Sequence, residues 1–248
     1  MIRSWPGSVT AVVLAVSAIT VSGCGGTSGL PSRRADSPTA ADRTLAEVTP
    51  LAIRAEGCTL VASLGTGFAV GGGLVVTVAH LIRGSTHVTV DGHPAEPLVV
   101  DLRSDVAVLR PSTDASVSAV SAVAGVLGIS GVSPGADTAD ATSGDPITVQ
   151  VLRDGSPSAL RATVVRTPMI HFEEPMDHTY YDRQGLFLDG LVIIKGDSGS
   201  PVVDSAGKVV GMVFATGQTR DRAYAVSAAE IRALLPHPDA NPTDTGHC

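Results

Sequence analysis

The sequence predicts an all-β protein, built as a sandwich or as barrels. Glycine accounts for 27 and proline for 16 of its 248 residues, and only 3% of the residues are aromatic. Short runs of Val, Ala and Thr alternate with Gly or Asp-Gly breaks. β-branched side chains suit a pleated, half-buried surface, so this pattern favours strands over a helical bundle. The length allows one large domain or two small ones.

The expected strands fall into two blocks, separated by a more polar stretch at residues 130–145. This division favours two β-barrels of similar size. Ser227 and Glu230 form a capping box, which predicts one helix that continues to about Leu235. The expected strands are residues 59–63, 67–70, 74–77, 87–90 and 106–109 in the first block, and 147–152, 161–165, 190–194, 201–203 and 209–213 in the second.

Residues 1–24 are expected to be a lipoprotein signal peptide. Arg3 supplies a positive charge, and the apolar run at residues 9–21 has signal-peptide length and is too short to span a bilayer comfortably. The run ends in Val21-Ser22-Gly23-Cys24, which resembles the lipobox of bacterial lipoproteins, whose cysteine is lipidated. We therefore expect an exported lipoprotein anchored to the cell membrane through Cys24 and facing the extracytoplasmic side. Ordinary secretion is the alternative.

The rest of the chain divides into a linker, a folded body and a tail. Residues 25–45 are rich in Gly, Ser, Pro, Thr and Ala without apolar periodicity, as in a flexible linker. The folded domain is expected at residues 46–236, with its two barrels divided near residues 130–145. Residues 237–248 are expected to form a loose C-terminal tail.

Composition also bears on partners. The formal net charge is -7, and Lys and Arg never gather into a patch that could neutralise a row of phosphates, which argues against nucleic acid as a partner. No cofactor and no metal ion is expected. His171 and His178 are the nearest candidates for a metal site, but they lack a recognisable liganding spacing.

Cys58 and Cys248 are expected to form a disulfide, because an even pair of cysteines outside the cytosol is usually bridged. The bridge would close a loop of roughly 190 residues, worth about 5 kcal/mol in the chain-entropy model before strain is subtracted. Two unpaired thiols are the alternative.

The segment Gly196-Asp197-Ser198-Gly199-Ser200-Pro201 lies between apolar runs and carries the chemical argument. Glycines on both sides allow a sharp turn that presents the Ser198 hydroxyl and directs the N–H groups of Gly196 and Ser198 toward one spot, where an oxyanion could lie. An ordinary Gly-Ser turn is the alternative. Two possible partners exist, since His80 ends one apolar strand and Asp105 opens another.

With these partners the chain resembles the trypsin-like serine proteases, in which the motifs T-x-A-H, D-x-A-x-L and G-D-S-G-x-P occur in this order. Here they are residues 77–80, 105–109 and 196–201. The resemblance implies a chymotrypsin-like fold of two six-stranded antiparallel β-barrels with a short C-terminal helix. It also implies that Ser198 is the nucleophile, His80 the general base and Asp105 the group that orients the histidine, with an oxyanion hole in the backbone of Gly196 and Ser198.

A closer resemblance is to bacterial HtrA-like and actinobacterial membrane-associated acid-resistance proteases. It rests on Gly65-Thr66-Gly67-Phe68 and Tyr224-Ala225-Val226, and the sequence does not continue into a PDZ domain. Val78 and Ser200 depart from the family pattern. No activation site is recognisable, so the partner of Asp197 is not predicted, and the bacterial resemblance implies activity without zymogen cleavage.

By the same analogy, the substrate pocket is expected to have Val192 near its base and Lys195 at its rim. One wall would be residues 213–216, which are Val213, Phe214, Ala215 and Thr216. An apolar base favours an aliphatic or small substrate side chain, because a buried charge would go unpaired. Arg222 offers an alternative, in which it lies at the back of the pocket and pairs with an acidic side chain of the substrate. Residues 171–184 are expected to be an exposed acidic loop.

The predicted function is an extracytoplasmic serine endopeptidase that cleaves proteins or peptides through an acyl-enzyme intermediate. A catalytically weak or inactive binding protein on the same fold is the alternative. An esterase using the same triad fits less well, because the strand-to-helix G-x-S-x-G turn of those enzymes is absent.

Overall fold

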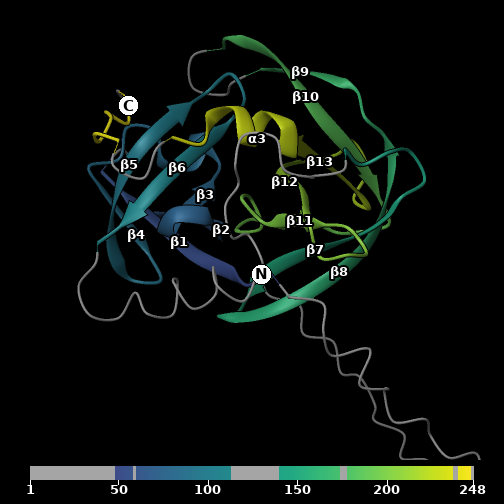
Figure 1. The fold of residues 1–248 in the computed structure, drawn as a ribbon, viewed down its shortest axis with the longest axis horizontal. Helices are drawn as coiled ribbons and strands as arrows, with labels where there is room; N and C mark the ends of the chain where they lie inside the picture. The colour runs from purple at the N-terminus through teal and green to yellow at the C-terminus, as the bar shows by residue number, and fades with distance from the viewer. Residues whose placement is uncertain (1–47, 58–59, 113–139, 174–177, 237–239, 247–248) are drawn as a thin grey trace, which may run out of the picture. The chain divides into compact units, whose positions relative to one another are not determined.

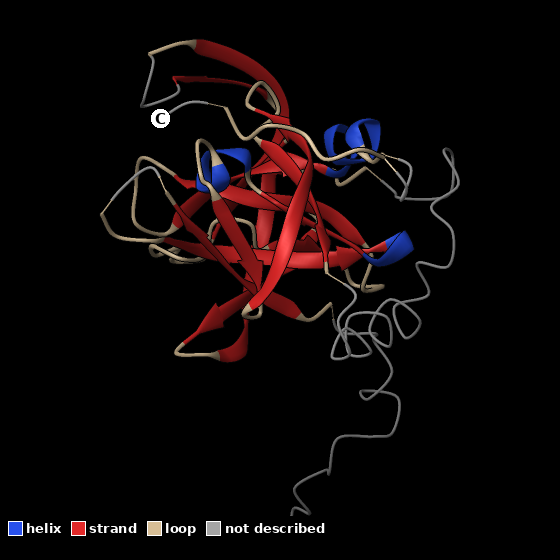
Figure 2. Ribbon diagram, turned by 90° about the vertical axis from the view of Figure 1, so that its left-hand side faces the viewer, coloured by secondary structure: helices blue, strands red, loops and turns tan. Residues whose placement is uncertain are grey.

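The computed structural model describes residues 48–57, 60–112, 140–173, 178–236 and 240–246. The chain divides into two units, residues 1–41 and 42–248, and all the described residues belong to the second. The described part is mostly β-strand with short helices, arranged as two barrels (Figure 1; Figure 2). The predicted all-β double barrel is therefore confirmed. No helix in these ranges is long and apolar enough to cross a bilayer.

The first barrel is closed by six antiparallel strands in the order β1-β2-β3-β6-β5-β4. Helix α1 (Ala79–Ile82) follows β3 directly. The strands are β1 (Pro50–Glu56), β2 (Ser63–Val70), β3 (Leu74–Thr77), β4 (His87–Val90), β5 (His93–Asp101) and β6 (Val106–Pro111).

The second barrel is a seven-stranded sheet in the order β13-β12-β11-β7-β8-β10-β9. Because β10 also pairs with β13, the sheet closes on itself and β9 extends outward from β10. The strands are β7 (Pro146–Arg153), β8 (Ser156–Arg166), β9 (Met169–Glu173), β10 (Tyr180–Asp189), β11 (Pro201–Val203), β12 (Val209–Thr216) and β13 (Arg222–Ser227), followed by α3 (Ala228–Leu234).

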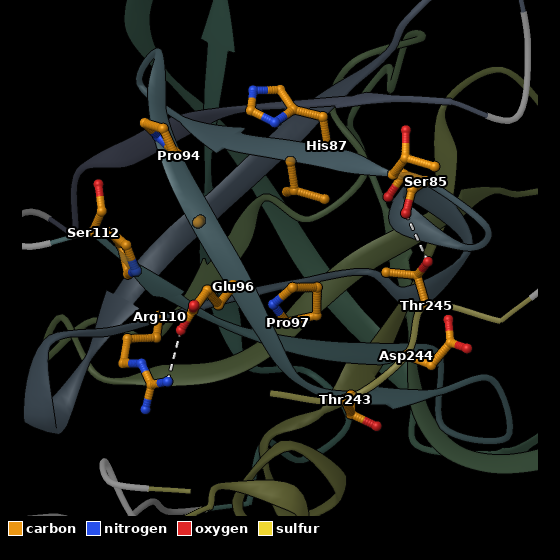
Figure 3. Close-up of a pocket in the computed structure, with 14 residues that line it drawn as sticks. Ser85, His87, Pro94, Glu96, Pro97, Arg110, Ser112, Thr243, Asp244 and Thr245 are labelled. Carbon is orange, nitrogen blue, oxygen red and sulfur yellow. Dashed lines mark hydrogen bonds and ion pairs between the residues drawn. The ribbon is translucent and has the colours of Figure 1, made fainter. Parts of the chain in front are cut away.

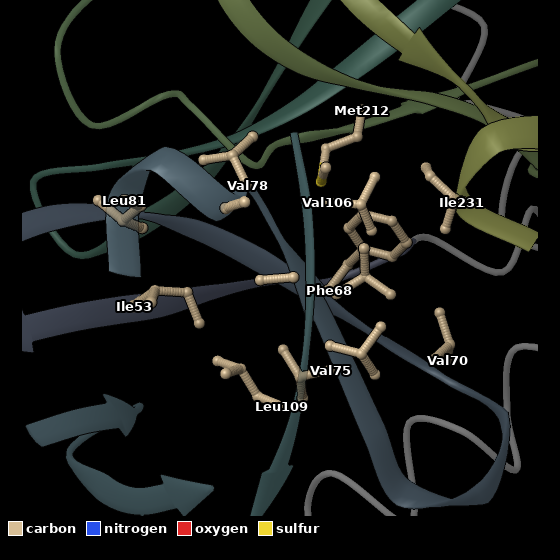
Figure 4. Packing of buried hydrophobic residues seen from close by; sticks show 14 of the residues in the cluster. Ile53, Phe68, Val70, Val75, Val78, Leu81, Val106, Leu109, Met212 and Ile231 are labelled. Atoms are coloured by element: carbon tan, nitrogen blue, oxygen red, sulfur yellow. The ribbon is translucent and has the colours of Figure 1, made fainter. Parts of the chain in front are cut away.

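One hydrophobic core continues from the first barrel to the second. Phe68 and Val106 of the first barrel belong to the same buried cluster as Met212 of β12 and Ile231 of α3 (Figure 4). Helix α3 contacts β6 as well as β10, β12 and β13. The two barrels therefore pack against each other, and this packing fixes the positions of the segments that lie between them.

Several predicted elements are confirmed. Strands β3, β4 and β11 have the predicted bounds. The predicted helix is α3, and the Ser227 hydroxyl accepts a hydrogen bond from the Glu230 N–H at 3.4 Å, as the capping box requires.

Two predicted strands are wrong. Residues 60–62 are not strand, and β2 begins at Ser63. Residues 190–194 are apolar but pair with no strand, because the N–H groups of Gly190 and Leu191 both donate to the carbonyl oxygen of Asp221. An apolar run thus lies in an irregular segment that leads to Ser198.

The acidic stretch at residues 171–184 is not a loop over most of its length, since β9 pairs with the first part of β10. Its polar side chains pair across the two strands. His171 Nδ1 lies 2.6 Å from Asp182 Oδ1, and a hydrogen bond from His178 lowers the pKa of Glu173. Cross-strand pairs of this kind stabilise a sheet without apolar alternation, which is why the prediction failed.

The C-terminal tail is not loose between residues 240 and 246. The Thr243 N–H donates to the Pro97 carbonyl oxygen at 2.8 Å, and Thr245 accepts from the Gly84 N–H at 2.9 Å. Thr245 Oγ1 also donates to the Ser85 carbonyl oxygen at 2.8 Å (Figure 3). The tail thereby borders a hollow of about 570 Å³ on the first barrel. Backbone hydrogen bonds hold it, and these leave no periodicity in the sequence.

Candidate active site

The structure brings His80 and Asp105 together. His80 lies in α1, and its Nδ1 is 2.8 Å from Asp105 Oδ2. The His80 backbone N–H also donates to Asp105 Oδ1 at 2.9 Å. A carboxylate only accepts hydrogen bonds, so Nδ1 carries the proton and Nε2 is the acceptor atom of the neutral ring. The Asp105 side chain is 4% exposed and the imidazole 35% exposed, so the carboxylate is enclosed and the ring is reachable.

Asp105 has a left-handed backbone conformation, with φ of +57°. This conformation is uncommon outside glycine, although aspartate tolerates it better than most residues. The preceding turn is fixed by a hydrogen bond of 3.0 Å from the Ser104 N–H to Asp101 Oδ2. Strain held by the surrounding structure is typical of functional sites.

Ser198 lies in the segment between β10 and β11, which is joined to β2 of the first barrel through Thr66. The Thr66 N–H donates to the Ser198 carbonyl oxygen at 2.8 Å, and Thr66 Oγ1 donates to the Gly196 carbonyl oxygen at 2.8 Å. Thr77 Oγ1 in turn donates to the Thr66 carbonyl oxygen at 2.8 Å. Thr66 is fully buried. One threonine of the first barrel therefore positions the serine segment of the second.

Close backbone approach explains two glycines at this junction. Gly199 has φ of +91°, and a side chain there would clash with the carbonyl oxygen of Thr66. A methyl group at Gly65 would lie 2.5 Å from Leu81 Cδ2 and 3.0 Å from the Ser198 carbonyl oxygen. Leu81 is the neighbour of His80, so the histidine helix and the serine segment meet at this point.

Asp197 is paired with Arg153, at the end of β7. Asp197 is 1% exposed, and its Oδ2 lies 2.7 Å from Arg153 Nη2. The Ile194 N–H donates to the same oxygen at 2.9 Å, and Arg153 Nη2 also donates to the Val192 carbonyl oxygen at 2.7 Å. The partner that the sequence left open is thus an internal arginine. It ties the residue before the serine to β7 and to the segment at residues 192–194.

Comparison with known proteins identifies the domain. The family model of the trypsin-like peptidase domain matches residues 65–212, more than half of the chain. The chain belongs to this family. It is accordingly a serine endopeptidase, a hydrolase that acts on proteins or peptides.

Solved structures similar to this chain include peptidases. The active form of the Rv3671c protease from M. tuberculosis shares 23% identity over 84% of this chain and 88% of that chain, with a TM-score of 0.66. The inactive form of the same protease gives 22% identity, coverage of 78% and 89%, and a TM-score of 0.56. The serine endoprotease from Yersinia pestis gives 15% identity, coverage of 80% and 66%, and a TM-score of 0.56. No curated protein matches the chain.

The residues expected to line the peptidase's substrate pocket differ in exposure. Val192 is 45% exposed, and Lys195 and Thr216 are also exposed. Val213 is fully buried, Phe214 is 3% exposed and Ala215 is intermediate. Arg222 Nε donates to Asp189 Oδ1 at 2.9 Å across β13 and β10, so its charge already has a carboxylate partner. The pocket stays a prediction for this peptidase.

Other predicted residues lie apart from this site or outside the described ranges. His171 and His178 pair with Asp182 and Glu173 on the hairpin of β9 and β10. Within the described ranges, no three side chains of the kinds that bind metal ions form a cluster. Cys24, Cys58 and Cys248 lie outside the described residues.

Three residues that contact the site of the peptidase were missed as functional candidates. Thr66 appeared only as part of a family segment, and Arg153 and Arg183 were not considered. Arg183 is the least expected, because its guanidinium lies in the core with Nη1 3.4 Å from Asp105 Oδ2. Its position in β10 was hidden by the interpretation of residues 171–184 as a loop. A lone arginine before the apolar run at residues 186–188 was the only available indication.

Proposed function

We propose that the chain is an exported serine endopeptidase in which Ser198, His80 and Asp105 form the catalytic triad. Ser198 Oγ attacks the carbonyl carbon of the scissile peptide bond, and its proton passes to His80 Nε2. The imidazolium then gives this proton to the leaving amine as the C–N bond breaks, which leaves an acyl ester on Ser198. Water activated by His80 cleaves the ester and restores the serine.

The contact between His80 and Asp105 is the observation that carries this proposal. The hydrogen bond from His80 Nδ1 to the buried carboxylate fixes the tautomer in which Nε2 accepts a proton, and the bond from the His80 backbone N–H holds the carboxylate in place. A structural histidine needs no such arrangement. The 35% exposure of the ring also leaves it accessible to a substrate.

The serine segment supports an oxyanion hole made by the backbone of Gly196 and Ser198. Gly196 has φ of +101°, and its carbonyl oxygen is held by Thr66 Oγ1. No described residue accepts a hydrogen bond from the N–H of Gly196 or Ser198. Two donors fixed in this way can stabilise a developing negative charge without reorganising during the reaction.

A cleavage assay tests the proposed reaction. The purified domain should hydrolyse an unfolded protein, and Ser198→Ala should lower the rate by several orders of magnitude. Hydrolysis of a simple ester without proteolysis would indicate an esterase. If neither substrate is turned over by the folded protein, the alternative of a binding protein on this fold would be favoured.

The proposed location is the extracytoplasmic face of the cell membrane, with the mature chain anchored through a lipid on Cys24. Support comes from the charged, apolar and Val21-Ser22-Gly23-Cys24 sequence features of residues 1–24. Mass spectrometry of the mature N-terminus separates the two routes, because a diacylglyceryl cysteine shows lipidation and an unmodified downstream residue shows ordinary secretion.

The proposed disulfide between Cys58 and Cys248 is supported by the residues that flank it. The Thr86 N–H donates to the Glu56 carbonyl oxygen at 2.7 Å, and Thr245 exchanges hydrogen bonds with Gly84 and Ser85. Glu56, two residues before Cys58, and Thr245, three residues before Cys248, therefore contact the same segment at residues 84–86. A bridge here would fasten the C-terminal tail to the first barrel.

A further inference from the structure

Arg183 is a buried cation in the core of the site. Its side chain is 1% exposed, although arginine is almost never fully buried without a partner. The guanidinium carbon lies 4.8 Å from the ring centre of Phe214 and 5.2 Å from that of Phe172. The two rings meet edge to face at 5.4 Å. Aromatic faces on β9 and β12 thus hold a desolvated positive charge in place.

The charge of Arg183 is directed at the carboxylate that orients His80. Arg183 Nη1 lies 3.4 Å from Asp105 Oδ2, the oxygen that also receives the proton of His80 Nδ1 at 2.8 Å. Arg183 Nη2 donates to the Leu102 carbonyl oxygen at 3.3 Å. Nε and Nη1 have no hydrogen-bond partner among the described residues. The contact with Asp105 is therefore mainly one of charge.

The other charges near Arg183 come from two further elements. Asp101 ends β5, and Glu230 in α3 accepts a hydrogen bond from the neighbouring Gln184 N–H at 3.1 Å. Burial lowers the pKa of Arg183, while Asp105, Asp101 and Glu230 act in the opposite direction. A guanidinium nevertheless stays charged at any pH at which a protein is folded. Protonation of His80 would therefore place a second positive charge beside the carboxylate of Asp105.

We propose that Arg183 is a positioning residue that acts through Asp105 and extends the neutral, base form of His80 to lower pH. The inference rests on the proposed catalytic triad. Arg183 and a protonated His80 would share one carboxylate oxygen, so each reduces the attraction available to the other. Without Arg183, Asp105 would stabilise the imidazolium more strongly, and His80 would become protonated at a higher pH. With Arg183 present, the pH below which kcat/KM falls, which is the acid limb of the pH profile, is therefore lower.

The test is the pH dependence of kcat/KM for the wild-type domain and four variants. Arg183→Gln retains a donor for the Leu102 carbonyl oxygen, and Arg183→Met retains packing between the two rings. Either should move the acid limb upward by about one pH unit. Arg183→Lys keeps the charge and should leave the limb near its wild-type position. Arg166→Met removes an exposed arginine, 5.1 Å above the Phe187 ring, and should change nothing.

A folded Arg183→Gln or Arg183→Met domain with the wild-type acid limb would overturn the inference. Arg183→Lys provides a second check, because a folded Arg183→Lys domain whose acid limb moves upward by about one pH unit would also contradict a role for the charge at this position. Failure of the triad itself would look different, because the wild-type domain would then show no Ser198-dependent activity at any pH.

Discussion

Arg153 and Asp197 form an internal ion pair beside the proposed nucleophile, with Nη2 and Oδ2 2.7 Å apart. Asp197 is 1% exposed, so its charge needs a partner in the folded state. Because Arg153 belongs to β7, this partner is present as soon as the second barrel folds. The site therefore does not depend on a newly cleaved N-terminus to neutralise Asp197.

Arg153→Met should reduce both stability and catalysis. Removing one member of a buried ion pair leaves an uncompensated charge and costs about 3–5 kcal/mol, toward the lower end here because Arg153 is 29% exposed. The released carboxylate should also loosen the segment at residues 192–198 and lower kcat/KM. Urea denaturation and steady-state kinetics measure the two effects.

The matched control for that change is Arg54→Met. Arg54 and Glu56 also form an ion pair, but both side chains are about half exposed. Loss of such a pair costs about 0–1 kcal/mol. Equal effects of the two substitutions would show that the Arg153 pair has no special part in the site.

Thr66→Val tests the connection between the barrels. Valine has the shape of threonine but cannot donate to the Gly196 carbonyl oxygen, a hydrogen bond of 2.8 Å in the native structure. We expect a loss of about 1–2 kcal/mol in the free energy of unfolding and a lower kcat, because the proposed oxyanion hole at Gly196 and Ser198 loses a fixed contact. Thr163→Val, at an exposed position of β8, should alter neither quantity. An unchanged kcat in folded Thr66→Val would contradict this part of the account.

Gly199→Ala should be far more harmful than Gly92→Ala. Both glycines have positive φ, +91° and +81°, so alanine is conformationally unfavourable at each. Only at Gly199 would the added methyl group meet the Thr66 carbonyl oxygen, whereas nothing lies within 4 Å at Gly92. Gly92→Ala should cost about 1 kcal/mol, and Gly199→Ala should prevent the active fold. Similar melting temperatures for the two variants would be inconsistent with the packing described.

Reduction of the proposed disulfide between Cys58 and Cys248 should lower the melting temperature and the activity together. The chain-entropy model gives about 5 kcal/mol for a loop of this length before strain. Thermal unfolding with and without reductant measures the change, and a Cys58→Ser/Cys248→Ser variant should be insensitive to reductant. An unchanged melting temperature of the wild-type domain on reduction would rule out the bridge.

Sequence reasoning could predict the fold class and the local motifs, but not the contacts that join them. His80 and Asp105 stand in short patterned segments, and the structure brings them within hydrogen-bonding distance. The capping box at Ser227 is equally local. The sequence pattern does not reveal contacts between residues that are far apart along the chain. Such contacts are made by Thr66, Arg153 and Arg183, whose partners lie in other segments. The apolar run at residues 190–194 wrongly predicted a strand, because an apolar run does not show where its backbone hydrogen bonds go, and here the N–H groups of Gly190 and Leu191 donate to the Asp221 carbonyl oxygen.

The most direct test of the central claim is the reaction of the folded domain with a fluorophosphonate probe, followed by mass spectrometry of the labelled peptide. The probe reacts with a serine that is activated by a base and supported by an oxyanion hole. The account predicts labelling confined to Ser198, abolished in Ser198→Ala and strongly reduced in His80→Ala. Absence of labelling in a folded, oxidised domain, or labelling at a different serine, would contradict it.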